Sequence, residues 1–114
     1  MPFIEVKTNK TTTKAEETLL KEKLGKAIES IPGKSERWLM VNLIDSCKLY
    51  FQGDGELPAA YVEVKILGSV DRAAYERMTG AVCEILSSVL EIAPDRVYVK
   101  YEACADWGWN GSNF

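Results

Sequence analysis

The first 44 residues show a strand-like pattern, then a helix-like one, then a second strand-like one. Residues Phe3 to Lys7 alternate between apolar and polar side chains, as a half-buried strand does. Thr13 to Glu16 fits the capping box of a helix start, and apolar residues follow at helical spacing: Leu20, Leu24, Ala27, Ile28 and Ile31. Pro32 and Gly33 end this segment, and Trp38 to Ile44 reads as a second strand. The pattern predicts a β-α-β unit.

The same order recurs in the second half of the chain. Ile4–Lys7 returns as Val62–Lys65, 58 positions later, and Glu36–Met40 resembles Asp95–Val99, 59 positions later. Between them, Ser69 and Asp71 are possible caps of a helix that ends at Ala93-Pro94 and has an apolar stripe of Ala74, Met78, Ala81, Val82, Ile85 and Val89. Two such repeats predict one α+β domain over residues 1–114, with a four-stranded mixed sheet and both helices on one face.

The predicted strands carry apolar residues on both faces. In the second one, Trp38, Met40 and Ile44 alternate with Leu39, Val41 and Leu43. With both helices on one side of the sheet, the other side would be left uncovered, and the sheet edges would lack partners. Self-association would satisfy both needs, so we expect an oligomer.

Composition narrows the classes of function. The chain has 14 basic and 17 acidic residues, so its charge gives no reason to expect nucleic-acid or membrane binding. It has no histidine, which excludes His-based triads and His metal sites. Its three cysteines form no CxxC pair, no segment resembles a signal peptide, and no window approaches the ~18 apolar residues of a membrane span. We expect a cytoplasmic protein without a metal.

Pro2 is the first candidate for chemistry. Removal of the initiator methionine, which is usual before a small residue, would leave a secondary amine at the start of the first strand. If that strand carries the nitrogen into an apolar pocket, desolvation lowers its pKa toward the range of a general base. The alternative is that Met1-Pro2 is an ordinary chain start.

Three segments match one known family. Pro2, the run Pro94–Tyr98, and the tail Gly108–Ser112 with Phe114, set in a duplicated β-α-β layout, resemble the macrophage migration inhibitory factor family of the tautomerase superfamily. The resemblance spans essentially the whole chain. It implies a homotrimer whose sheets line a central channel, with active sites between neighbouring subunits. It also implies cofactor-free keto–enol tautomerism of phenylpyruvate-like 2-oxo acids.

The resemblance carries over residue by residue. It makes Pro2 the general base and assigns substrate-binding positions to Lys34 (carboxylate), Leu67 (backbone groups), Tyr98 (from the adjacent subunit), Trp109 and Phe114 (pocket rim) and Trp38 (aromatic wall). These types suit an α-keto acid, because a cation binds its carboxylate and aromatic walls hold its flat enol. Lys100 departs from the family's asparagine. It either adds a second cation to the pocket or is a solvated strand residue.

Two other features have ordinary structural interpretations. Cys83 lies on the apolar stripe of the second helix, so we expect a buried core thiol. Residues Gln52 to Glu56 are expected to form a connecting turn. Two other functions remain open. One is a cytokine-like binding protein with a vestigial pocket, and the other is a related superfamily reaction on small unsaturated acids.

Overall fold

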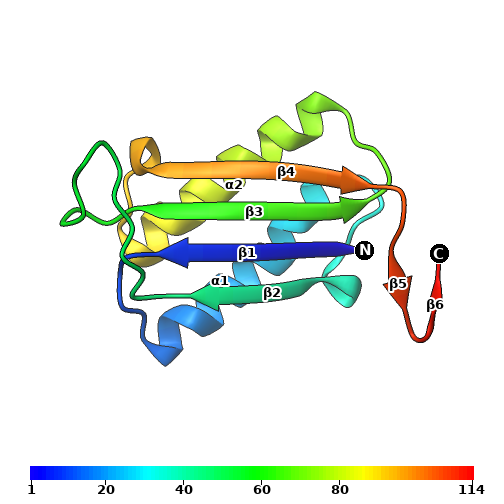
Figure 1. The fold of residues 1–114 in the computed structure, drawn as a ribbon, viewed down its shortest axis with the longest axis horizontal. Coiled ribbons are helices and arrows are strands. Elements are labelled where there is room, and N and C mark those ends of the chain that lie inside the picture. Colours follow the sequence, from blue (N-terminus) through cyan, green and yellow to red (C-terminus); the bar gives the residue numbers. More distant parts are fainter.

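The computed structural model describes every residue from Met1 to Phe114 and shows two β-α-β units joined into one sheet. The principal elements are β1 (Pro2–Thr8), α1 (Lys14–Ala27), β2 (Met40–Ile44), β3 (Ala60–Leu67), α2 (Arg72–Leu90) and β4 (Val97–Cys104). The strand order is β2-β1-β3-β4, with β1 antiparallel to β3 and each outer strand parallel to its inner neighbour. Both helices cover the same face of this sheet (Figure 1). The predicted duplication and mixed sheet are confirmed.

The core lies between the sheet and the helices. Alternate residues of the two central strands face it, among them Ile4 and Val64, which are fully buried. The predicted apolar positions of α1 are all buried. In α2 the predicted positions Ala81 and Val89 are only half-buried, while Leu86 and Leu90 complete the core.

Polar side chains set the starts of both helices. The Thr13 hydroxyl accepts a hydrogen bond from the Glu16 N–H, and the Glu16 carboxylate accepts one from the Thr13 N–H. The predicted capping box is therefore confirmed. At α2 the cap is Asp71, whose carboxylate accepts from the Ala74 N–H at 2.9 Å. This helix ends at Leu90, earlier than predicted, because Glu91 takes a left-handed conformation with φ 56°.

The open face of the sheet corrects the expectation of apolar residues on both sides. On the three strands β1, β3 and β4 this face carries a charge lattice, which we define as the ion pairs Glu5–Lys7, Glu63–Lys65 and Lys100–Glu102, with N···O distances of 3.2, 3.7 and 3.2 Å. On β2 the open face carries Met40 and Ile44, with Asn42 between them donating to Glu5 at 3.0 Å. Trp38 precedes that strand, as the last residue of a 3₁₀ turn, η2 (Glu36–Trp38). Alternating apolar residues did not distinguish this turn from a strand.

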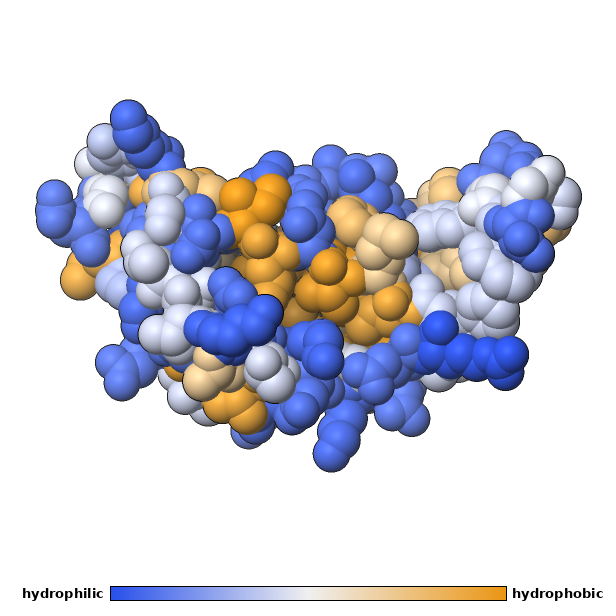
Figure 2. Space-filling model, turned by 90° about the horizontal axis from the view of Figure 1, so that it is seen from below, coloured by the Kyte–Doolittle hydropathy of each residue, from blue (hydrophilic) through white to orange (hydrophobic).

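Apolar surface is concentrated along the side of the molecule where β2 and α1 lie. Figure 2 looks onto this side and shows a continuous apolar band between polar margins. The edge strand β2 contributes Met40, 68% exposed, and the half-buried Val41 and Leu43. The apolar band and the unpaired edge of β2 together form a surface that water solvates poorly.

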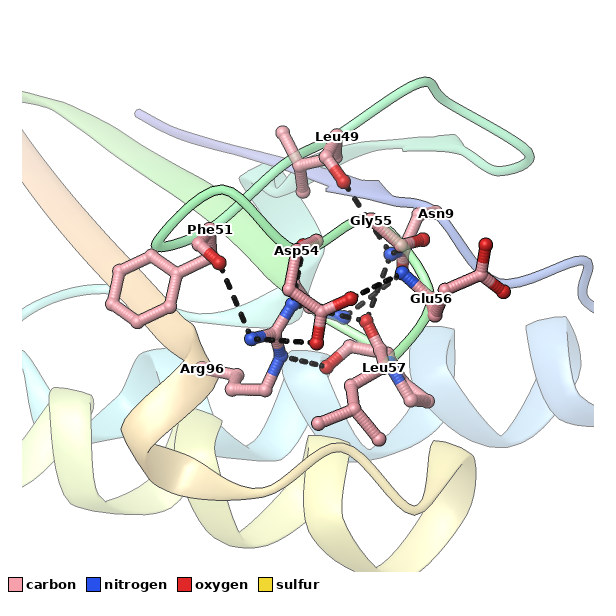
Figure 3. A network of polar contacts seen from close by, with 10 residues as sticks. Asn9, Leu49, Phe51, Asp54, Gly55, Glu56, Leu57 and Arg96 are labelled. Carbon is pink, nitrogen blue, oxygen red and sulfur yellow. Dashed lines mark hydrogen bonds and ion pairs between the residues drawn. The ribbon is translucent and has the colours of Figure 1, made fainter.

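The long connection between β2 and β3 is fixed by two side chains from other elements. The Arg96 guanidinium donates to the carbonyls of Phe51, Asp54, Leu57 and Pro58, and the Asn9 amide donates to those of Leu49, Gly55 and Leu57 (Figure 3). The predicted connecting turn lies within this segment, where Phe51 and Asp54 form an isolated bridge. No helix in the chain is both long and apolar enough to span a bilayer.

Candidate active site

The candidate site is built around the first residues of β1. Pro2 is buried and pairs with Ile66 of β3. The Leu67 N–H donates to the Met1 carbonyl at 3.1 Å, and the Lys34 ammonium donates to the Leu67 carbonyl at 2.8 Å. Met1, Leu67 and Lys34 are therefore joined in one hydrogen-bonded chain beside Pro2. With Met1 in place, the Pro2 nitrogen is an amide and has no basic lone pair.

The surroundings of this chain end disfavour positive charge. The pKa of the Met1 α-amino group is lowered, first by burial and then by the Lys34 ammonium beside it. Both causes belong to this place in the fold rather than to Met1 itself. An amine on Pro2 would lie one residue further along the same strand, close to the same cation.

Aromatic side chains form one side of the site. A cavity of about 560 Å³ is lined by Pro2, Trp38 and Trp109, among others. The ring centroids of Trp38 and Trp109 lie 4.9 Å apart in an edge-to-face contact, and the Phe114 ring stacks on Trp109 at 6.1 Å. The short hairpin of β5 (Gly108–Trp109) and β6 (Ser112–Asn113) brings these tail residues to the end of the sheet where the N-terminus lies (Figure 1).

Tyr98 and Lys100 lie away from this cavity within one chain. Tyr98 pairs with Tyr61, which pairs with Lys7, so it lies at the opposite end of the sheet from Pro2. It is 63% exposed, and Phe51 packs against its ring at a centroid distance of 5.3 Å. Lys100 is exposed on the open face, where its ion pair with Glu102 raises the pKa of its ammonium. In the single chain, Lys100 is a solvated strand residue.

The structure adds lining residues that the sequence interpretation missed, among them the cations Arg37 and Lys65. Arg37 lines the same cavity as Pro2, and its guanidinium carbon lies 5.0 Å from the centroid of the Trp38 ring. Its position three residues after Lys34, beside an aromatic residue, was the available signal.

The three cysteines are free thiols, and one of them departs from its expected burial. Cys83 is half-buried and lies outside the main core cluster, so the expectation of a buried core thiol is wrong. Partial burial raises the pKa of its thiol. No three His, Cys, Asp or Glu side chains are grouped closely enough to hold a metal ion.

Comparisons with known proteins agree over the whole chain. The family model described as macrophage migration inhibitory factor matches residues 1–114. The macrophage migration inhibitory factor of Rattus norvegicus is 31% identical, with 100% of this chain and 99% of that protein covered. The crystal structure of Leishmania major MIF2 superimposes with a TM-score of 0.93 at 29% identity, covering 100% of this chain and 97% of that one. A homologue from Prochlorococcus marinus gives 0.88 at 32% identity, with 98% of each chain covered.

Proposed function

The chain belongs to the macrophage migration inhibitory factor family, and on this basis we propose that, once Met1 is removed, it is a tautomerase of phenylpyruvate-like 2-oxo acids. The observation that carries the proposal is the position of Pro2, buried at the start of β1 beside Lys34 and an aromatic wall. Burial and the neighbouring cation lower the pKa of a terminal amine at this place, which favours the neutral form that proton abstraction requires.

Removal of Met1 has two consequences at the site. It converts the Pro2 nitrogen from an amide into a basic secondary amine. It also frees the Leu67 N–H, which donates to the Met1 carbonyl in this structure. That N–H and the Lys34 ammonium, which donates to the carbonyl of the same residue, would then bind the substrate carboxylate.

The reaction moves one proton from carbon to oxygen. The Pro2 amine takes a proton from C3 of the 2-oxo acid, the C3–H electrons form the C2=C3 double bond, and the C2=O π electrons move onto the oxygen. The Pro2 ammonium then gives its proton to this enolate oxygen, which becomes the enol hydroxyl and leaves the amine neutral again. In the reverse direction the Pro2 ammonium returns the proton to C3. A donor at the carbonyl oxygen stabilises the developing enolate, and the Tyr98 hydroxyl is suited to this role.

Within one chain Tyr98 cannot serve its own Pro2, because the two lie at opposite ends of the sheet. We therefore include a homotrimer in the proposal, with each site completed by Tyr98 of a neighbour. The apolar band along β2 and the open edges of β2 and β4 support such an assembly, because a partner strand would pair the edge and cover the band.

The decisive experiment compares three forms of the N-terminus in a phenylpyruvate tautomerase assay, after mass spectrometry has verified each one. These are the chain beginning at Pro2, the Pro2→Gly variant, and a form with one extra residue before Pro2. The first should be active. The second should lose roughly 100-fold or more in kcat/KM because the ring amine is absent, and the third should be inactive because its nitrogen is an amide. Equal rates in all three forms would overturn the proposal.

A further inference from the structure

Arg37 is an exposed cation without a protein partner that lines the candidate site, whereas Lys65, the other charged side chain lining the cavity, pairs with Glu63 at 3.7 Å. None of the four ion pairs in the structure includes Arg37, and its guanidinium makes no hydrogen bond to another residue. The carboxylate next to it in sequence, that of Glu36, occupies the space over Gly25 of α1. No acidic side chain lines the cavity that Arg37 shares with Pro2. The full charge and all the donors of Arg37 are thus available to a ligand.

The internal repeat offers a comparison for the unpaired state of Arg37, because its counterpart Arg96 is fully paired. Arg37 and Arg96 occupy equivalent positions, each in a 3₁₀ turn that precedes an outer strand: η2 before β2, and η3 (Pro94–Arg96) before β4. Arg96 is used entirely by the segment before β3, through four carbonyls and Asp54. At the equivalent place before β1, Arg37 instead borders the cavity that contains Pro2.

The Trp38 ring holds the Arg37 guanidinium over the cavity. The cation lies 5.0 Å from the centroid of that ring, and Trp38 is itself fixed against Trp109. A planar guanidinium held over an aromatic face keeps its edge free, and that edge is the part that binds a carboxylate with two parallel hydrogen bonds.

From this arrangement we propose that Arg37 is a specificity-determining residue that binds a second anionic group, so that the site favours 2-oxo acids carrying a distal carboxylate. The inference rests on the proposed tautomerase function and names its substrate class. Lys34 binds the carboxylate next to the reacting carbonyl. The aromatic wall formed by Trp38 and Trp109 accommodates the body of the substrate, and Arg37 binds the distal carboxylate.

The test uses a matched pair of substrates, phenylpyruvate and its para-carboxy derivative, and three variants: Arg37→Gln, Arg37→Lys and Lys23→Gln. Lys23 is an exposed cation of α1, so its variant controls for the loss of one positive charge. We expect the ratio of kcat/KM for the dicarboxylate to that for phenylpyruvate to fall roughly tenfold or more in Arg37→Gln, by the loss of one charge-assisted contact. It should fall less in Arg37→Lys and stay unchanged in Lys23→Gln.

An unchanged ratio in Arg37→Gln, or an equal loss for both substrates, would overturn the inference while leaving the tautomerase proposal intact. Calorimetric binding of the unreactive pair cinnamate and 4-carboxycinnamate separates the two proposals. If neither 2-oxo acid is turned over, the proposed function fails. The Arg37 inference is then supported if Arg37→Gln weakens the binding of 4-carboxycinnamate more than that of cinnamate, and it is overturned if both are weakened equally or not at all.

Discussion

In the proposed reaction the ammonium of Lys34 acts on both the base and the substrate. It donates to the Leu67 carbonyl and, together with burial, it lowers the pKa of the terminal amine in this structure. A cation beside an amine disfavours its protonated form, so it extends the neutral, reactive form to lower pH. In the proposed reaction the same charge would attract the substrate carboxylate. Substrate affinity and the pKa of the base would therefore be coupled through one side chain.

Lys34→Gln should separate these two effects in a pH–rate profile. Without the cation, the pKa of the Pro2 amine rises, so the ascending limb of kcat/KM against pH moves to higher pH. KM for phenylpyruvate should increase roughly tenfold through loss of the charge-assisted contact. The profile is measured beside that of Lys23→Gln, which removes a distant charge. A higher KM with an unmoved limb would show that Lys34 binds the substrate without tuning the base.

At the residue scale, the family resemblance predicted which side chains lie together. It named Pro2, Lys34, Trp38 and Trp109, and they do gather at one end of the sheet. Arg37 was missed because the feature that distinguishes it is the absence of an ion pair or hydrogen bond. Whether an arginine is neutralised depends on the orientation of its neighbours, and sequence spacing does not encode that orientation.

At the scale of elements, the β2–β3 connection shows how one buried cation can fix a long loop. The Arg96 side chain is only 11% exposed and is bound by Asp54 and by carbonyls from Phe51 to Pro58 (Figure 3). The loop in turn places Phe51 against Tyr98, with a cation–π contact from Arg96 at 5.5 Å. The position of Tyr98 therefore depends on Arg96 through the loop.

Arg96→Gln should lower the free energy of unfolding by about 2–4 kcal/mol, because it removes a partly buried charge and leaves several carbonyls without donors. Urea denaturation measures this, and Arg72→Gln, at an exposed arginine of α2, is the control. Tautomerase turnover should also fall, since the loop no longer holds Phe51 against Tyr98. A variant as stable as the control would mean that water replaces the guanidinium at little cost.

Element boundaries were harder to predict than element types. Period-2 and helical patterns located all four long strands and both long helices, because the buried faces determine those periods. They failed at Trp38, because the apolar residues from this 3₁₀ turn onward alternate in the sequence as they would in a strand. They also led to too broad an estimate of the apolar open face, since β2 was taken to represent strands whose exposed positions carry the charge lattice.

At the scale of the whole molecule, the sheet separates the two halves of a site. Its antiparallel centre places the start of β1 beside the end of β3, so that Pro2 and Tyr98 lie at opposite ends. No rearrangement of side chains within one chain can bring them together. Either Tyr98 has no catalytic part, or it acts on a neighbouring chain. These alternatives predict different behaviour when two inactive variants are mixed.

Subunit mixing tests this directly. Pro2→Gly and Tyr98→Ala are each expected to lose most activity, yet co-refolding equal amounts should restore about a quarter of the wild-type sites, those that combine an intact Pro2 from one chain with an intact Tyr98 from its neighbour. Light scattering on the same samples should report a trimer, whose apolar band along β2 is covered. Full activity of Tyr98→Ala alone would remove the neighbour from the chemistry. A mixture no more active than its components, although trimeric and folded, would show that no site draws on two chains.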